Sequence, residues 1–293
     1  MVLTDCSVKC WGYSLSEAHI LLSAETKAQE GDTPQKLPNA LAEYAGFSLS
    51  RDAFLLSLPS GLRFHYVQGC GVNFSQPDTV ADAEVRLFLN GSVYGAVAWI
   101  NGFLPLHTSA IVHDGKIHAF TGESGAGKST LSAALSARGL PLFADDVLVL
   151  DMRDKAGIMA LPGHKKLKLW GDAIDMTGLQ AGAQVMAGMD KFFVEPPLLH
   201  QSHPLPVTDL YLLDEAAQAP SLTPILGAAR FTLVRSAFYR PEFCAVLAEK
   251  LGLFSHIARL ANEVAIHRFD RPRNGALFNE GADFMAEAIR RRA

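Results

Sequence analysis

The feature that most constrains the fold of this chain is a glycine-rich octapeptide, GESGAGKS, at residues 122–129. It matches the pattern G-x-x-x-x-G-K-[ST] at every fixed position. The glycines let the backbone curl so that successive N–H groups point inward at phosphate oxygens, and a helix that follows adds the positive end of its dipole. Lys128 can reach the β- and γ-phosphates of a nucleotide, and the Ser129 hydroxyl can bind Mg²⁺. The sequence therefore predicts a phosphate-binding loop that takes ATP and Mg²⁺.

The segments around this loop supply the strand and helix that it needs. Residues 109–113 and 116–121 are strand-like runs separated by Asp114-Gly115, a strong hairpin signal. The second run enters the loop, and residues 129–138 follow as a helix with Gly139 at its end. Further strands are expected at 140–150, 167–170, 210–213 and 231–234, and closing helices at 243–253 and 281–292. Strands that alternate with helices around a glycine-rich loop indicate an α/β nucleotide-binding core. The residues predicted to contact the nucleotide are Gly122, Glu123, Ser124, Gly125, Ala126, Gly127, Lys128, Ser129 and Thr130.

The N-terminal part of the chain has a different character. Residues 25–38 are polar and predict a surface loop, and residues 47–74 alternate short apolar runs with glycine and proline, a pattern typical of strands and turns. Residues 82–100 predict a helix with an apolar face that ends near Gly102. We therefore divide the chain into a small, mostly β (α+β) region at residues 1–80 and a nucleotide-binding domain at residues 81–293.

Composition excludes several classes of protein. The 293 residues carry a net charge of −4, which argues against broad nucleic-acid binding. The apolar stretch 87–106 is interrupted by polar residues and predicts a buried helix rather than a membrane span. The N-terminus lacks the apolar core of a signal peptide, and four cysteines are too few for a disulfide framework. Cys6 and Cys10 have no second Cys/His pair at zinc-finger spacing. We expect a cytoplasmic protein with no nucleic-acid or membrane partner, for which a homo-oligomer is an open alternative.

Phosphoryl transfer also needs a carboxylate near the loop, and two segments offer one. Asp145 and Asp146 interrupt an apolar run, where adjacent acids are costly unless a metal or a basic group meets them. Asp214 and Glu215 follow four apolar residues and resemble the Walker B strand of transporter-type ATPases. No LSGGQ-type signature precedes them, however, and residues 216–220 indicate a strand that ends in a loop. We therefore favour the first pair and keep a transporter-type ATPase as an alternative.

From residue 104 to residue 150 the sequence resembles the HPr kinase/phosphorylase family, which has a phosphoenolpyruvate-carboxykinase-like core. His107 stands fifteen residues before Gly122, and Ala144-Asp145-Asp146 begins sixteen residues after Lys128. The resemblance implies that Asp145 is the base that takes the proton of a serine hydroxyl. It implies that Asp146 is a Mg²⁺ ligand beside Ser129, and that His107 supports the acid pair. On its own residues, a satisfied core histidine is the less favoured alternative for His107.

The sequence departs from this family at two places. Thr130 stands where the bifunctional enzymes carry Glu after the first Ser/Thr of the loop helix. Their later L-E-I-R-G-type segment, with a metal-binding Glu, is matched at best by residues 167–171, where Lys168 replaces the acid. These departures argue against a reverse phosphorylase activity and against the protein HPr as the substrate.

A divergent branch of HPr-kinase-like enzymes looks closer, on residues 104–107, 162–170 and 190–192. Some of these enzymes are encoded with lasso-peptide precursors and phosphorylate a serine of the precursor. Four lysines could then receive phosphate or an acidic peptide terminus: Lys165, Lys166, Lys168 and Lys191. Lys166 and Lys168, two residues apart, could equally form the solvated face of a strand. The tail at residues 290–292 is expected to be a solvated helix end.

The sequence thus predicts an ATP-dependent serine kinase that acts on a peptide or protein, with Asp145, His107 and Lys128 as catalytic residues and Ser129 and Asp146 as metal ligands. A small-molecule kinase on the same core and an HPr(Ser) kinase/phosphorylase are the alternatives. A peptide kinase should have an open groove beside Asp145, whereas a small-molecule kinase should close over it.

Overall fold

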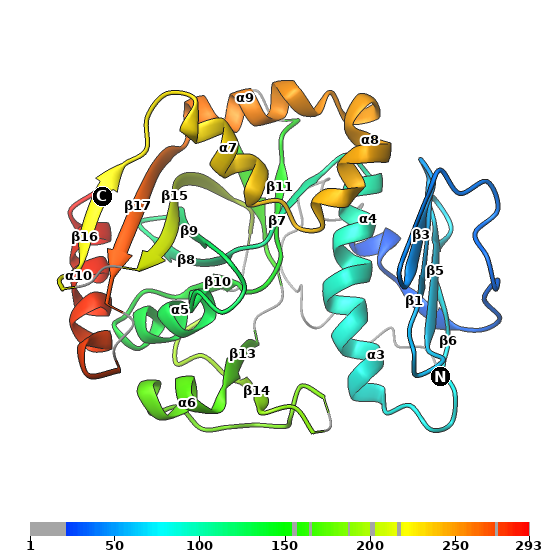
Figure 1. Cartoon of the computed structure of the whole chain (residues 1–293), viewed down its shortest axis with the longest axis horizontal. Coiled ribbons are helices and arrows are strands. Elements are labelled where there is room, and N and C mark those ends of the chain that lie inside the picture. The colour runs from blue at the N-terminus through cyan, green and yellow to red at the C-terminus, as the bar shows by residue number, and fades with distance from the viewer. Residues whose placement is uncertain are drawn as a thin grey trace.

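A computed structural model of the chain describes residues 22–153, 157–163, 166–186, 188–199, 203–215, 218–272 and 275–292. The predictions for Cys6, Cys10 and Lys165 fall outside these ranges. The fold is mixed α/β, as the sequence predicted, and its helices pack between and around the sheets (Figure 1).

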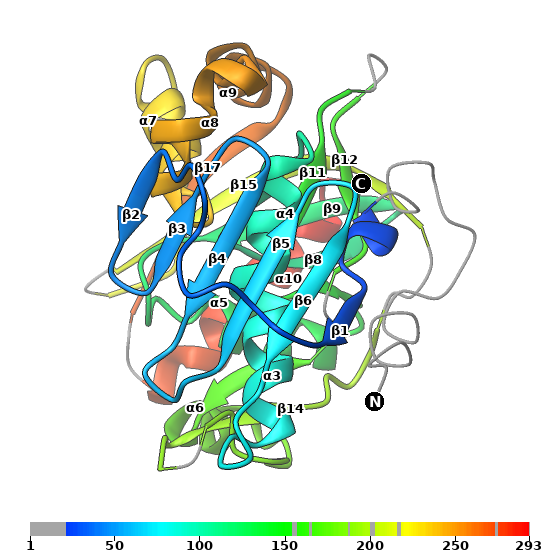
Figure 2. The same ribbon diagram turned by 90° about the vertical axis from the view of Figure 1, so that its right-hand side faces the viewer.

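A six-stranded sheet forms one side of the molecule and faces the viewer in Figure 2. Its spatial order is β1-β6-β5-β4-β3-β2, and the strands are β1 (Ala28–Glu30), β2 (Ala42–Tyr44), β3 (Phe47–Leu49), β4 (Ala53–Ser57), β5 (Arg63–Val67) and β6 (Gly71–Ser75). Burial alternates along β5 and β6, which is the pattern of strands with one face on a core. The strands and turns predicted for residues 47–74 are confirmed. The surface loop predicted for residues 25–38 is wrong at β1, which adds to the sheet by parallel pairing with β6.

A continuous helical segment separates this sheet from the rest of the fold (Figures 1 and 2). It comprises α3 (Asp82–Phe88), a π-helical turn η1 (Leu89–Val93) and α4 (Tyr94–Ile100), and the chain turns at Gly102 with a φ of +84°. Every residue of α4 is buried, so the predicted buried helix is confirmed. Because side chains of the six-stranded sheet and of α4 share one hydrophobic cluster with strands beyond the helix, the two regions pack as neighbours.

The larger sheet carries the glycine-rich loop. Its main path is β10-β8-β9-β15-β12-β11-β7, and β17 pairs with both β15 and β16. Its strands are β7 (Leu104–Leu106), β8 (Ser109–His113), β9 (Lys116–Thr121), β10 (Leu142–Ala144), β11 (Leu148–Asp151), β12 (Met159–Leu161), β15 (Leu205–Glu215), β16 (Ser221–Pro224) and β17 (Ala265–Arg271). The predicted hairpin joins β8 to β9, with positive φ at Asp114 and Gly115 as its tight turn requires.

Helices cover both faces of this sheet. On one face α5 (Lys128–Ala137) and α10 (Phe278–Arg290) pack over side chains that include Phe120 and Tyr211. On the other face lie α4, α7 (Ala229–Ser236), α8 (Cys244–Leu251) and α9 (Leu253–Glu263). A smaller unit of β13 (Leu167–Trp170), α6 (Gly171–Thr177) and β14 (Lys191–Val194) packs against α5.

Three predictions about elements are wrong. Residues 231–234 are helical within α7. The strand prediction failed because so short a run has no periodicity that separates a strand from a helix. Residues 167–170 form a strand, but β13 pairs with β14 rather than with the larger sheet. The arginine tail is not simply solvated: Nη1 of Arg292 lies 3.1 Å from Asp209 Oδ1, and its Nη2 lies 2.8 Å from His267 Nε2. These contacts anchor the end of α10 to the sheet.

Candidate active site

The glycine-rich loop joins the C-terminal end of β9 to the first turn of α5, as the sequence predicted. Gly127 has a φ of +83°, a left-handed conformation that glycine adopts without strain. A Cβ at Gly127 would lie 2.6 Å from Nη2 of Arg271, so a side chain there would displace the arginine. Arg271 Nη2 donates to the carbonyl of Ala126 at 2.6 Å. Arg271, from the end of β17, therefore holds the loop in place, and no local sequence signal marks it for this role.

Lys128 is the cation of the loop. Its ammonium donates to the carbonyl oxygens of Gly122, at 2.9 Å, and of Glu123, at 3.2 Å. Burial lowers the pKa of Lys128, and the nearby carboxylates of Asp145 and Asp146 act in the opposite direction. The loop lysine and the acid pair therefore belong to one electrostatic unit.

The acid pair lies at a corner between two strands. β10 pairs with β8, whereas β11 pairs with β7 and β12. Asp145 and Asp146 fill the corner, and Asp146 has a φ of +71°, which turns the chain. The prediction that these acids interrupt a strand is confirmed. Because of the turn, the two carboxylates meet different partners.

Asp145 faces the loop helix. Its Oδ1 accepts a hydrogen bond from the Ser129 hydroxyl at 2.8 Å, and its Oδ2 accepts one from the backbone N–H of Lys168 at 3.3 Å. The residue is only 2% exposed. Burial raises the pKa of Asp145, the adjacent Asp146 raises it further, and the Ser129 hydrogen bond opposes both effects. A cation bound beside Ser129 would stabilise this buried carboxylate.

Asp146 faces Lys168 and His107. Its Oδ2 lies 2.8 Å from Lys168 Nζ, and its Oδ1 lies 3.5 Å from His107 Nδ1, beyond normal hydrogen-bond length. Nδ1 of His107 also lies 3.1 Å from the Asp146 carbonyl oxygen. Burial alone would raise the pKa of Asp146, but the charge and hydrogen bond of Lys168 lower it below its ordinary value. The structure thus brings His107 to the acid pair, as the family resemblance implied.

Opposing effects act on the pKa of His107, and the net shift is downward. Burial lowers its pKa, the positive charge of Lys128 lowers it further, and Asp146 raises it less. The direct cationic partner of Asp146 is therefore Lys168 rather than the histidine.

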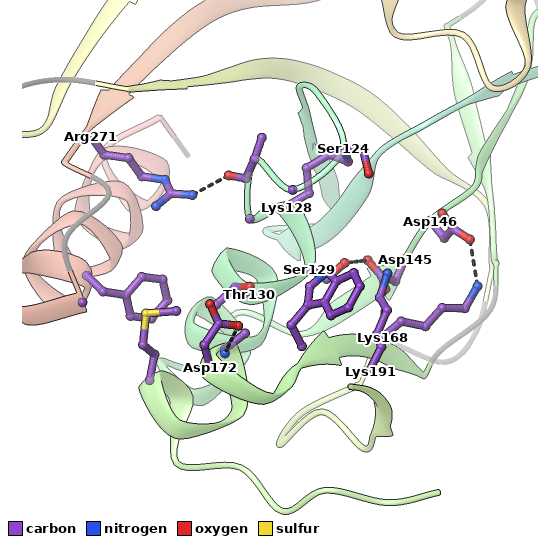
Figure 3. A pocket seen from close by; sticks show the side chains of 18 of the residues that line it. Ser124, Lys128, Ser129, Thr130, Asp145, Asp146, Lys168, Asp172, Lys191 and Arg271 are labelled. Atoms are coloured by element: carbon purple, nitrogen blue, oxygen red, sulfur yellow. Dashed lines mark hydrogen bonds and ion pairs between the residues drawn. The ribbon is translucent and has the colours of Figure 1, made fainter. Parts of the chain in front are cut away.

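These residues line one pocket of about 320 Å³ (Figure 3). Its charged end holds the acid pair, Lys168 and Lys191, and Arg271 lies at the opposite end. The apolar lining residues Met176, Pro272 and Phe278 come from α6, from the position after Arg271 and from the start of α10. The loop lies between these ends and contributes residues 124–130, Thr130 among them. The pocket therefore combines a charged end, the glycine-rich loop and an apolar part of its lining.

The three described lysines of the group considered for anion binding lie in different surroundings. Lys166 points outward and pairs with Glu195 at 3.0 Å. Lys168 forms an ion pair with Asp146, and the Lys168 side chain is only 11% exposed. Lys191 lies over the Trp170 ring, 5.3 Å from its centroid, at the pocket. Of the described lysines in the group, Lys168 and Lys191 therefore belong to the site and Lys166 does not.

The competing acids, Asp214 and Glu215, end strand β15, as the sequence analysis favoured. β15 runs parallel to β9, but these acids line a second pocket of about 340 Å³ with Glu123, and they are not among the residues that line the first. Ser129 instead bonds to Asp145. The geometry therefore selects the acid pair at the strand corner.

Sequence reasoning missed Tyr239, which lies behind the acid pair. Its ring packs on Gly95: a Cβ at Gly95 would come within 2.5 Å of the ring. A Cβ at Gly91, in the π-helical turn, would lie 3.5 Å from the Tyr239 hydroxyl and 3.9 Å from Asp146 Oδ2. Burial raises the pKa of Tyr239, and the Asp146 charge adds to this, so the phenol stays neutral. The sequence signal for this contact was the pair Gly91 and Gly95, four residues apart in a helix predicted to be buried. Glycines at this spacing allow an aromatic ring to approach the helix backbone.

The sequence matches no protein-family model and no curated protein sequence. Among solved structures, the fold is similar to the HPr(Ser) kinase/phosphatase from Coxiella burnetii, with 13% sequence identity and a TM-score of 0.32. The match covers 64% of this chain and 99% of the other. A likeness this distant assigns no activity or substrate. None of the helices in the described residues has the length and apolar character needed to cross a membrane.

Proposed function

We propose that this protein is an ATP-dependent phosphotransferase that transfers the γ-phosphoryl group to a serine hydroxyl of a peptide or protein. The observation that carries the proposal is the 2.8 Å hydrogen bond between Ser129 and Asp145, in one pocket with Lys128. To catalyse phosphoryl transfer, a protein mainly has to position the reactants and neutralise the charge on the phosphate oxygens. A glycine-rich loop, a loop lysine and a buried acid beside the loop hydroxyl are suited to that task.

The polarity of the pocket suggests the direction in which the nucleotide lies. Its phosphates would follow the loop, with the terminal phosphate toward Asp145 and Asp146. Its base would lie at the apolar part of the lining, against Met176 and Phe278. This orientation leaves the charged end, beside Lys191 and Trp170, for the acceptor.

The residues present fit a magnesium ion. Within the described residues, no three His, Cys, Asp or Glu side chains form a metal-binding group. Mg²⁺ does not need one, because it is commonly held by one or two carboxylates, waters and substrate phosphates. The Ser129 hydroxyl and the Asp145 carboxylate are adjacent oxygen donors, and they would hold the ion. When bound, the ion supplies positive charge against the phosphate oxygens.

The geometry favours roles for the two acids opposite to those that the family resemblance implied. Asp145 is bonded to the loop hydroxyl and almost fully buried, which suits the metal side. The Asp146 side chain is 29% exposed, and its Oδ1 has no partner at normal hydrogen-bond length among the described residues. In the proposed reaction the acceptor oxygen forms a bond to the γ-phosphorus, the bond to the β-phosphate oxygen breaks, and ADP leaves with that electron pair. Asp146 Oδ1 takes the hydroxyl proton.

The test of this proposal is acceptor phosphorylation followed by mass spectrometry. The protein is incubated with Mg·ATP and, separately, with serine-containing peptides encoded beside its gene, with HPr, and with free serine or sugars. We expect a gain of one phosphate on a peptide serine. A gain confined to HPr or to a small metabolite would overturn the peptide acceptor, and ATP hydrolysis without any acceptor would overturn the kinase itself.

A further inference from the structure

Lys168 contacts both members of the acid pair. Its backbone N–H donates to Asp145 Oδ2 at 3.3 Å. Its Nζ lies 2.8 Å from Asp146 Oδ2, the contact marked in Figure 3. We propose that Lys168 is a built-in counter-ion of the acid pair, so that the site takes one divalent ion, beside Ser129 and Asp145, and none at Asp146. This inference rests on the proposed function and specifies its metal requirement.

The position of Lys168 is fixed by the residues beside it in β13. Leu167 and Leu169 are buried in a cluster with Ala133 of α5 and Leu142 of β10. Alternate residues of a strand point to opposite faces, so anchoring both leucines turns Lys168 toward the pocket. The ammonium is therefore held in place rather than carried on a mobile surface chain.

No other lysine or arginine in the described parts of the chain lies within ion-pair distance of Asp146. Lys128 donates to carbonyl oxygens of the loop, and Lys191 lies over Trp170. His107, the remaining basic neighbour, is farther away, with Nδ1 3.5 Å from Asp146 Oδ1. The charge that balances Asp146 thus comes from Lys168.

A second divalent ion at Asp146 would meet two obstacles. It would have to displace the Lys168 ammonium from the Asp146 carboxylate, and it would then lie beside that positive charge. At Asp145 no ammonium has to be displaced, because its direct contacts are the Ser129 hydroxyl and a backbone N–H. The charge arrangement therefore favours a single ion.

The inference is tested by counting ions rather than by activity. Mn²⁺ replaces Mg²⁺, a non-hydrolysable ATP analogue occupies the pocket, and the EPR signal of free Mn²⁺ is titrated against protein. We expect one Mn²⁺ per chain for the wild type and for Lys168→Arg, which keeps the charge. Lys168→Glu should bind a second Mn²⁺, because a third carboxylate replaces the cation. Lys166→Glu is the matched control, since it makes the same charge change two residues away at the Glu195 pair outside the pocket, and it should bind one.

Two Mn²⁺ per wild-type chain with the analogue bound would overturn this inference and leave the proposed function standing. A Lys168→Glu protein that is folded by circular dichroism and binds only one ion would also overturn it. If Lys168→Glu does not fold, the wild-type and Lys168→Arg counts decide the matter alone. Failure of the wild type to bind the analogue at all would overturn the proposed function, and this inference with it.

Discussion

The Ser129 hydroxyl and the Asp145 carboxylate meet at 2.8 Å across sixteen residues of chain. The hydrogen bond joins the first turn of the loop helix to the corner where β10 ends. It makes the glycine-rich loop and the acid pair parts of one site, and it distinguishes the two acids by what each one touches.

The first prediction separates the roles of these acids. Asp145→Asn should weaken nucleotide binding in the presence of Mg²⁺ and leave metal-free binding nearly unchanged, because the amide is a poor ligand for the ion. Asp146→Asn should retain Mg·ATP binding and lose phosphoryl transfer by about 10²- to 10⁴-fold, the usual contribution of a positioned base. Isothermal titration with and without Mg²⁺, together with a transfer assay, measures both effects.

Asp214→Asn is the control for these two variants, since Asp214 ends β15 in the second pocket. It should change neither binding nor transfer. The reverse pattern for Asp145 and Asp146 would restore the assignment that the family resemblance implied. An inactive Asp214→Asn protein would show that Asp214, rather than Asp145 or Asp146, is the carboxylate that acts with the loop.

A second prediction concerns the orientation of the nucleotide. Met176→Ala removes apolar contact at the part of the pocket where the base is placed. ATP should bind about three- to tenfold more weakly, from the loss of about 1 kcal/mol of apolar contact, while inorganic triphosphate binds as before. Met189→Ala, a half-buried methionine outside the pocket, serves as the control. Equal weakening of ATP and triphosphate would contradict the proposed orientation.

The loop and its flanking elements could be predicted because all their determinants are contiguous. The hairpin turn at Asp114-Gly115, the glycines and the helix follow one another within thirty residues. The acid pair could also be predicted from a local signal, because two adjacent acids within an apolar run are costly to bury without a partner. Residues 231–234 were misassigned for the converse reason: a short apolar run carries no period, and tertiary packing made it a helix.

The partners of the acid pair could not be predicted, because they come from elements far away in sequence. Polar and apolar residues alternate along residues 166–169, a pattern that fits Lys168 on a solvated strand face as well as in the site. The packing of Leu167 and Leu169 against α5 is what turns Lys168 toward the site. Arg271 comes from the end of β17, and Tyr239 comes from the connection that follows α7. No short pattern signals either one.

A third prediction tests the packing behind Asp146. Gly95→Ala places a methyl group within 2.5 Å of the Tyr239 ring, so the ring must move. Overpacking of this kind lowers the free energy of unfolding by about 1–3 kcal/mol, although alanine is the better helix former. Gly31→Ala, with no atom near its added methyl group, should change stability by less than about 0.5 kcal/mol. Chemical denaturation of both variants checks this, and equal stability would show that the ring is not confined.

A fourth prediction concerns pH and the Asp209 network. Burial alone would raise the pKa of Asp209, but hydrogen bonding to His118 and the charges of His118 and Arg292 lower it. An acid with a lowered folded-state pKa contributes stability that is full above its unfolded pKa, near 3.9, and is lost as pH falls through the folded value. Asp209→Asn should therefore cost about 2 kcal/mol at pH 7. The difference from the wild type should shrink as the pH falls below about 4.

The control for this variant is Asp283→Asn, which removes a largely exposed partner of Arg138. An exposed pair contributes about 0–1 kcal/mol, so its stability should follow the wild-type curve closely at every pH. A wild-type-to-Asp209→Asn difference that stays constant from pH 7 to pH 3 would contradict the proposed linkage.

The most direct test of the central claim follows the label of ATP onto an acceptor. Wild type and Lys128→Ala are incubated with Mg²⁺, a serine peptide, and ATP labelled with ³²P at either the γ- or the α-phosphate. The account predicts that only the γ-label reaches the peptide serine, and that Lys128→Ala, which removes the loop cation, abolishes the transfer. Transfer of the α-label, or wild-type transfer of the γ-label by Lys128→Ala, would contradict it.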